Sequence, residues 1–381
     1  MKKLLSFLFL SILVLRVAAQ NTDYLIHSLD FKVPLTSVDI SPDGKWILVG
    51  SEDGTLTVLD AATYALKFEL KNVAPAAIYD IEMSPKMDVI FLASGSRIML
   101  FDTTGVNIIN WSHNKNTIWS IDIDKKGGFM LSNEVNKTFQ LINIFEGTIE
   151  KSMRAHDDIA LVSAFSPDGK KIASGSSDKR ILLWDLESGA VIDEFQGHSE
   201  NIYDLAFSPD GTRIAAGSRD KTVRIWNIQE NKLIHLLKGH QEMVLEVEFH
   251  PSGLYLLSAS SDQSIRLWDL ASGKQLFAYL ESEGALTDIE FMPDGNSFLS
   301  TDMDGKLNTW EINPEIFVLN FFEKEYREEI SANPLFLPKQ KGEKKADYDL
   351  RVLEAEQERI ILVKKYYQKY LDILAKKSLS F

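Results

Sequence analysis

The sequence contains no cysteine. This absence excludes disulfide bonds, thiolate metal ligands and a thiol nucleophile. The sequence also lacks the HExxH metal motif, the GxSxG nucleophile elbow and the phosphate-binding GxxxxGK loop. Three Asp-Gly pairs, Asp168-Gly169, Asp210-Gly211 and Asp294-Gly295, lack the DxDxDG spacing of a calcium loop and are interpreted as hairpin turns. We therefore expect no cofactor, no metal site and no catalytic residue, and we predict that the protein is not an enzyme.

Basic residues are fewer than acidic ones, at 41 Lys and Arg against 55 Asp and Glu, which gives a net charge of −14. The imbalance is uneven, because residues 316–381 carry 13 basic and 11 acidic side chains, so the excess of negative charge lies before them. Such an acidic surface repels nucleic-acid phosphates and anionic lipids. We therefore expect no nucleic-acid partner. A partner protein with a basic surface would be favoured, although the acidity also fits a simple role in solubility.

Long apolar runs are absent except near the N-terminus, at residues 4–15. Two lysines precede this run and Val17-Ala18-Ala19 follows it as a small-residue cleavage site, so residues 1–19 are predicted to be a signal peptide cut before Gln20. The run is too short to span a bilayer, and the absence of cysteine excludes a lipid-anchored lipoprotein. The protein is predicted to be exported, either periplasmic or secreted, without a stable membrane anchor. The short signal is typical of a bacterium.

What the sequence does contain is a repeat of 42 residues. Two sets of aromatic residues keep this spacing independently: Trp184, Trp226, Trp268 and Trp310, and Phe165, Phe207, Phe249 and Phe291. Counting back towards the N-terminus adds three further units with other apolar residues in the tryptophan position. The result is seven units over residues 20–315, and an array with this period is a propeller or a solenoid.

Each unit has the pattern of four short strands. In residues 201–239, the runs NIYDLAFS, RIAAGS, TVRIWNI and KLIHLLKG are rich in β-branched and aromatic residues, and Asp, Gly, Asn and Pro separate them. No run in residues 22–315 has sustained helical periodicity. The repeat therefore predicts an all-β array of small antiparallel sheets.

Three units carry a set of residues that resembles the signature of the WD-repeat β-propellers. Each set has a histidine, a serine, an aspartate and a tryptophan at matching places: His156, Ser176, Asp178 and Trp184; His198, Ser218, Asp220 and Trp226; His240, Ser260, Asp262 and Trp268. The other four units keep only parts of the set. The resemblance covers about residues 22–315 and implies an all-β, seven-bladed WD-repeat β-propeller, followed by a mostly α-helical C-terminal extension.

In that family the four residues of a set form a hydrogen-bonded chain inside one blade. A buried indole N–H needs an acceptor, and a fully satisfied polar network fixes one strand register. We interpret the three sets as this structural network. A histidine, a serine and an aspartate together also suit a hydrolase. However, three copies of one active site, each in register with a buried indole, are implausible.

The resemblance also implies how the ring closes and where it binds. Residues 24–29 are expected to add the outer strand of the last blade beside residues 306–312, which resolves the open edge. The family mostly presents peptide-binding platforms, often on the narrower top face. The positions expected to project there precede the first-strand bulge or the Asp turn: Tyr79, Trp119, Leu161, Tyr203, Leu245 and Thr287, with Ser177, Arg219 and Ser261 at the turn. The aromatic members suit binding anchors and equally suit ordinary propeller side chains.

Residues 316–381 differ from the repeats. Residues 316–345 are mixed and charged and are predicted to be a linker. Residues 346–381 are predicted to hold an amphipathic helix, because Leu353, Ile360, Tyr367 and Leu374 recur every seven residues. This helix either packs on its own propeller or docks on a partner, and a second copy of the chain is one such partner.

Two function classes remain. The first is an exported, non-catalytic protein-binding scaffold; the alternative is an exported propeller enzyme or small-ligand binder that uses the central funnel. The inner strands argue against the alternative, because their starts offer the apolar Ile78, Ile118, Val162 and Ile202. Four carboxylates follow one or two positions later, namely Asp80, Asp204, Glu246 and Asp288. They are the best hint of a cation or ligand site, and hydrogen bonding at strand ends is the preferred explanation.

Overall fold

The computed structural model describes residues 24–86, 88–112, 116–280, 282, 284–340 and 343–378. The predicted signal peptide, residues 1–19, lies outside these ranges. The described residues divide into two compact units, one from Leu25 to Glu311 and the other from Ile312 onward, which also includes Tyr24. No helix among the described residues is both long and apolar enough to cross a membrane.

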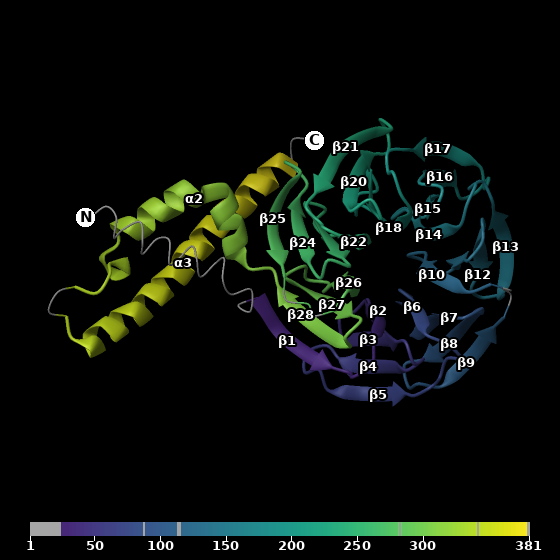
Figure 1. Ribbon diagram of the computed structural model, residues 1–381, viewed down its shortest axis with the longest axis horizontal. Helices are drawn as coiled ribbons and strands as arrows, with labels where there is room; N and C mark the ends of the chain where they lie inside the picture. Colours follow the sequence, from purple (N-terminus) through teal and green to yellow (C-terminus); the bar gives the residue numbers. More distant parts are fainter. Residues whose placement is uncertain are drawn as a thin grey trace. The chain divides into compact units, whose positions relative to one another are not determined.

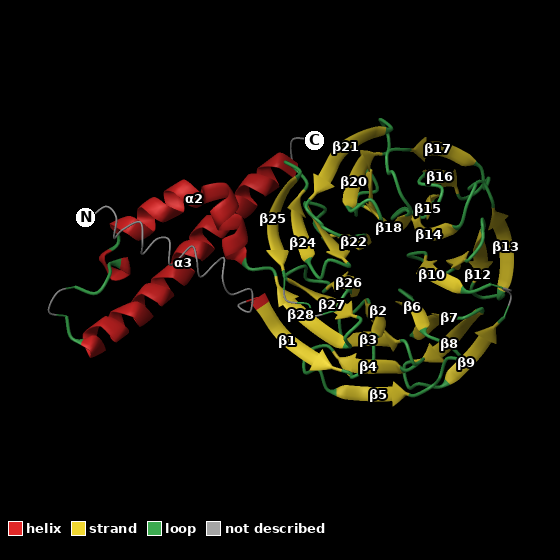
Figure 2. Ribbon diagram, viewed as in Figure 1, coloured by secondary structure: helices red, strands yellow, loops and turns green. Residues whose placement is uncertain are grey.

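The first unit is a ring of seven four-stranded antiparallel sheets, or blades, around one axis (Figures 1 and 2). The first three blades consist of β2 (Leu35–Ile40), β3 (Trp46–Ser51), β4 (Leu56–Asp60) and β5 (Leu66–Leu70); β6 (Ile78–Met83), β7 (Val89–Ser94), β8 (Arg97–Asp102) and β9 (Asn107–Trp111); and β10 (Ile118–Ile123), β11 (Phe129–Glu134), β12 (Phe139–Asn143) and β13 (Thr148–Met153). In each blade the first strand is innermost and the fourth is outermost. The sequence prediction of a seven-bladed propeller is therefore confirmed.

The next three blades repeat this order. They consist of β14 (Ala160–Phe165), β15 (Lys171–Ser176), β16 (Ile181–Asp185) and β17 (Val191–Phe195); β18 (Ile202–Phe207), β19 (Arg213–Ser218), β20 (Thr222–Asn227) and β21 (Lys232–Lys238); and β22 (Val244–Phe249), β23 (Tyr255–Ser260), β24 (Ile265–Asp269) and β25 (Lys274–Tyr279). The register repeats as well, since each tryptophan of a third strand lies opposite an Ile or Leu of the second strand.

The seventh blade joins the two ends of the ring. It consists of β26 (Leu286–Phe291), β27 (Ser297–Asp302), β28 (Lys306–Glu311) and β1 (Leu25–Asp30), which pairs antiparallel with β28. Leu29 lies opposite Leu307 in this pairing. The outer edge of β28 is thus covered by the start of the chain, as the sequence predicts, and the ring closes through hydrogen bonds.

The core lies between neighbouring blades, where the inner strand of one blade packs against the second strand of the blade before it. Ile202 of β18 is fully buried and packs with Val162 and Ala173 of the preceding blade. Close approach requires a very small residue at Gly175, because a Cβ atom there would lie 2.7 Å from Cγ2 of Ile202.

Tight hairpins connect the strands. Gly169, Gly211 and Gly295 adopt φ of 65°, 69° and 68°, which confirms the Asp-Gly turns predicted above.

The second unit corrects the expected linker at 316–345. Helix α2 (Pro314–Ala332) occupies most of it, followed by a short 3₁₀ turn, η2 (Pro334–Phe336). Asn313 caps α2 by accepting a hydrogen bond from the backbone N–H of Glu315, and Pro314 provides the start. The charged composition concealed this helix, because its buried residues, which include Phe322, Tyr326 and Ile330, are spaced by four among exposed glutamates.

Helix α3 (Lys345–Ser378) packs along α2. Up to residue 373, its buried residues are Ala355, Leu362, Tyr366 and Tyr370, whereas Leu353 and Ile360 of the expected heptad face are 65 % and 44 % exposed. Within the pair of helices, Arg359 forms an ion pair with the buried Glu315, which also accepts a hydrogen bond from Tyr326 at 2.9 Å. The heptad row at 353 and 360 is therefore not the packed face. The sequence prediction chose this row because α2, the helix against which α3 packs, was not recognised.

Candidate functional site

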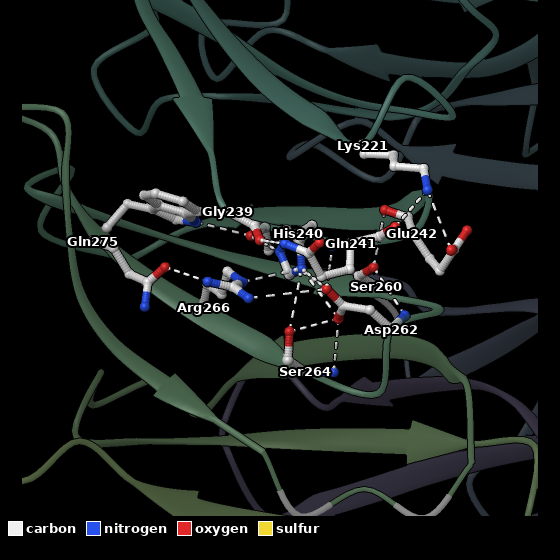
Figure 3. Close-up of polar contacts among 12 residues, drawn as sticks. Lys221, Gly239, His240, Gln241, Glu242, Ser260, Asp262, Ser264, Arg266 and Gln275 are labelled. Carbon is white, nitrogen blue, oxygen red and sulfur yellow. Dashed lines mark hydrogen bonds and ion pairs between the residues drawn. The ribbon is translucent and has the colours of Figure 1, made fainter. Parts of the chain in front are cut away.

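The His-Asp pairs of the three repeat sets are formed inside single blades. Nδ1 of His156 lies 2.9 Å from Asp178, and Nδ1 of His240 lies 3.1 Å from Asp262 (Figure 3). Both histidines are buried. Because Nδ1 faces a carboxylate, it carries the proton, and Nε2 is left as an acceptor in the neutral ring. Burial lowers the pKa of His240, which keeps the imidazole neutral.

The serine of the network differs from the one expected. Ser174 accepts a hydrogen bond from the indole N–H of Trp184 at 2.8 Å and lies 2.8 Å from Nε2 of His156. Ser258 does the same for Trp268 and His240. The serines assigned from the sequence are corrected, because they lie two residues later, at the turn: Ser176, Ser218 and Ser260 accept the backbone N–H groups of Asp178, Asp220 and Asp262.

The turn aspartates stay ionised. Burial alone would raise the pKa of Asp178, but hydrogen bonds from His156 and Arg180 outweigh it and hold the pKa below its ordinary value. Hydrogen bonds from His240 and Ser264 likewise outweigh burial and hold the pKa of Asp262 below its ordinary value. Asp262 also accepts the backbone N–H of Gln241 at 2.7 Å (Figure 3). These contacts tie the turn to the loop that leads into the inner strand. The set is therefore a structural clamp in each of these three blades.

One of the three clamps is incomplete. In the blade of β18–β21, Ala216 occupies the register position of Ser174 and Ser258. His198 still pairs with Asp220 at 2.9 Å, but its buried Nε2 has no hydrogen-bond partner. An unsatisfied buried polar atom lowers the stability of the fold.

The expected face residues gather at one end of the blades. Tyr79, Trp119, Leu161, Tyr203, Leu245 and Thr287 are each the second residue of an inner strand, at a bulge that the ladder skips. Ser177, Arg219 and Ser261 follow the second strands, and their backbone N–H groups bond the residues that lead into the same inner strands. The two sets therefore lie on one face of the propeller, named here the bulge face.

Trp119 is the most exposed large aromatic residue of the bulge set. Its side chain is 46 % exposed, and its ring lies 5.1 Å from the ring of Tyr79 in the neighbouring blade. Tyr203, Leu161 and Leu245 are partly buried, and Arg219 is exposed. Five consecutive blades, from β6 to β22, thus present an apolar or aromatic residue at this position, whereas the other two blades present Thr36 and Thr287. The result is an apolar arc beside the axis.

The bulge also determines which residues face the axis. Ile78, Ile118 and Ile202 are fully buried between blades, not inward as expected. The third and fifth residues of the inner strands are mostly partly buried and line the axis, where the seven strands converge (Figure 1). Nine of these fourteen positions hold carboxylates, named here the axial carboxylates, and none holds Lys or Arg: Asp39, Asp80, Glu82, Asp122, Asp204, Glu246, Glu248, Asp288 and Glu290.

Most axial carboxylates link one blade to the next. Third-position residues accept the backbone N–H of the fourth residue of the next inner strand, as Asp80 does from Ile121 at 2.8 Å. Fifth-position residues accept from the sixth residue, as Asp39 does from Met83 at 2.6 Å. Asp204, Asp288, Asp122 and Glu248 make equivalent bonds. The expected hydrogen bonding is present, but it runs between blades instead of at strand ends.

The axial carboxylates have raised pKa values because the inner strands bring them together in a partly buried place. Burial raises the pKa of Asp39, Asp122 and Asp288 to about 7. Burial, followed by repulsion from Asp39 and Asp122, also raises the pKa of Glu82 well above its ordinary value. Among the described residues, no group of three or more His, Cys, Asp or Glu has the arrangement of a metal site. The axis is therefore a concentration of carboxyl groups that lose their protons less readily than isolated ones.

Completing the unfinished clamp should stabilise the protein. In the variant Ala216→Ser, the new hydroxyl can donate to Nε2 of His198, and we expect the free energy of unfolding to rise by about 1 kcal/mol. The converse variant Ser174→Ala, which removes a complete link, should lower it by about 1–3 kcal/mol. Thermal and denaturant unfolding measure both. An unchanged or lower stability of Ala216→Ser would contradict the account of the clamp.

Removing one axial charge should stabilise the protein in a pH-dependent way. Because the folded-state pKa of Glu82 is raised, its contribution to stability is complete below its ordinary pKa of 4.5 and is lost as the pH rises through the folded value. Glu82→Gln should therefore raise the free energy of unfolding by on the order of 1 kcal/mol near pH 8, and much less near pH 5. Unfolding curves at both pH values measure this difference. The exposed Glu187→Gln is the control, and equal effects of the two variants would refute the axial interpretation.

Comparison with known proteins agrees with the geometry. The model for the WD domain, G-beta repeat, matches residues 24–60, and the model for the IFT122 first beta-propeller matches residues 160–325. The chain is 30 % identical over 162 residues to Actin-interacting protein 1-2 of Arabidopsis thaliana, which is 40 % of this chain and 26 % of that protein. It is 29 % identical over 154 residues to Protein groucho of Drosophila melanogaster, which is 40 % of this chain and 16 % of that protein.

A third relative is the Intraflagellar transport protein 122 homolog of Mus musculus, which is 34 % identical over 114 residues, or 30 % of this chain and 6 % of that protein. The chain thus matches about a quarter or less of the length of each of these relatives. The two family models match residues within the repeats, and the second extends to residue 325 in α2. Together with the seven blades, they support a place for this chain among the WD-repeat β-propellers.

Proposed function

We propose that the protein is a non-catalytic scaffold that binds other proteins on the bulge face. The observation that carries the proposal is the exposed Trp119, whose ring lies against that of Tyr79 within the apolar arc. Exposed aromatic residues in a rigid setting are the side chains that dominate binding energy in protein interfaces. The relatives add support, because one of them is named an actin-interacting protein.

The residues that suggest hydrolytic chemistry form structural hydrogen bonds inside the blades. His156 and His240 are buried, each bonded to an aspartate and a serine within its own blade. A general base must reach a substrate proton, and these rings cannot do so without dismantling the clamp. This favours a binding role over hydrolysis for the three sets.

We further propose that the scaffold acts after export from the cell that makes it, in the periplasm or outside. The charged start, the apolar run at 4–15 and the small residues before Gln20 support this. The protein isolated from its native source should begin at Gln20, and the intact mass measured by mass spectrometry tests this. A mass that includes residues 1–19 in the bulk of the protein would contradict export by this route.

Binding on the bulge face should depend on Trp119. We expect Trp119→Ala to reduce capture of native partners from an envelope extract by at least about tenfold, since loss of an interface anchor removes about 2 kcal/mol or more. The measurement is cross-linked capture on the full chain, followed by quantitative mass spectrometry. Phe145→Ala is the matched control, because Phe145 is 74 % exposed in a turn after a third strand, at the opposite face. Equal loss in both variants, or no loss in Trp119→Ala, would move the binding site elsewhere.

A further inference from the structure

We propose that the segment bound on the bulge face presents an arginine or lysine side chain to the axis, where the axial carboxylates receive it beneath Trp119 and Tyr79. The occupant is thus an extended segment of a partner protein with at least one unpaired cationic side chain. This inference rests on the proposed function, because it names the chemistry of the partner bound at that face.

The apolar arc and the carboxylates are close along the same strands. Tyr79 is the second residue of β6, Asp80 is the third and Glu82 is the fifth. A strand advances about 3.3 Å per residue, so Asp80 follows Tyr79 by about 3 Å along the strand and Glu82 follows it by about 10 Å. A long side chain that enters between the inner strands therefore passes the aromatic pair before it meets the charges.

The charge at the axis selects a cation. Nine carboxylates face the axis, and none of the fourteen third and fifth positions holds a basic residue. Several of the carboxylates repel one another across the ring, since Asp288 and Asp39 both raise the pKa of Asp80, after the larger effect of burial. An arriving ammonium or guanidinium group relieves this repulsion, whereas an acidic or neutral segment does not.

Two carboxylates can receive the cation without loss of a link between blades. Among the described residues, Glu82 and Glu290 accept no backbone hydrogen bond, in contrast to Asp80 or Asp39. Glu246, near the bulge face, shares a hydrogen bond with Asp204. These side chains reach the axis with oxygens that a guanidinium can engage in pairs.

The aromatic pair favours the same occupant. The face of an indole or phenol ring attracts a cation, and arginine also stacks on such rings. Trp119 and Tyr79 lie at 52° to each other, so they present two differently oriented rings on the bulge face. An apolar side chain of the partner could bind to the apolar arc, but it would leave the charge of the axial carboxylates without a counter-charge.

A random peptide library tests the chemistry of the occupant, because such a selection does not require an identified partner. The full chain is immobilised, phage that display short random peptides are selected on it, and the bound sequences are counted. The same selection is made on Trp119→Ala, on the double variant Glu82→Gln/Glu290→Gln, and on the control Phe145→Ala. The glutamine variants keep the side-chain shape and break no backbone bond, and thermal unfolding verifies that every variant is folded.

We expect arginine and lysine to be enriched among peptides selected on the wild-type chain and on Phe145→Ala, and this enrichment to disappear on the double variant. For the best peptide, replacement of its arginine by the neutral isostere citrulline should weaken binding by at least about tenfold, as measured by fluorescence polarisation. Binding should also weaken with added salt, because the attraction is between charges.

The other outcomes separate the two proposals. Peptides without basic residues that bind the wild type but not Trp119→Ala would overturn the cationic occupant and leave the bulge face as the binding site. Peptides that bind all four proteins equally would overturn the bulge face itself. Small cationic ligands such as free arginine binding as tightly as the best peptide would point to a ligand funnel instead of a protein-binding scaffold.

Discussion

The architecture depends on one constraint: a four-stranded blade has two apolar faces and cannot cover either of them alone. Each blade must be covered by the blade before it and the blade after it, so only a closed ring leaves no face exposed. The pairing of β1 with β28 is the contact that satisfies this constraint, because it completes the last blade with the first strand of the chain. The small residues at Gly175 and Gly217 serve the same end by letting the next inner strand approach.

Closure has an electrostatic consequence at the axis. Seven inner strands converge there, and the residues that point inward cannot be covered by another blade. Carboxylates suit these positions because they accept backbone N–H groups of the neighbouring blade, as Asp204 does from Val247. The same convergence brings like charges together, so the bonds that join the blades also build a negative axis. A site for a cation therefore arises from the way the ring is held together and needs no separate element.

Sequence periodicity was sufficient for the number of blades, the turns and the closing strand, because these follow from a spacing that Trp184, Trp226 and Trp268 repeat. The periodicity failed to predict which face of a strand a side chain occupies, because a shift of one residue reverses that face. The bulge at Tyr79 and its equivalents shifts the strand by one position, so Ile78 is buried between blades and Asp80 reaches the axis. The clamp serine was misplaced by two residues for a related reason, since Ser174 and Ser176 point to the same side of one strand. Helix α2 was missed because its buried residues lie among exposed glutamates and include a charged residue, Glu315, so the segment has the composition of a linker.

Two populations of carboxylates with opposite pKa shifts coexist in this ring. The clamp aspartates, such as Asp178, have lowered values, so their contribution to stability is present above their ordinary pKa of 3.8 and is lost as the pH falls. The axial group, such as Asp288 with a pKa of about 7, contributes fully only below 3.8 and loses that contribution as the pH rises through 7. Stability from both groups is thus greatest on the acidic side of neutrality. At higher pH a bound cation can replace the missing protons, so a basic segment at the axis would stabilise the propeller most where the ring by itself is least stable.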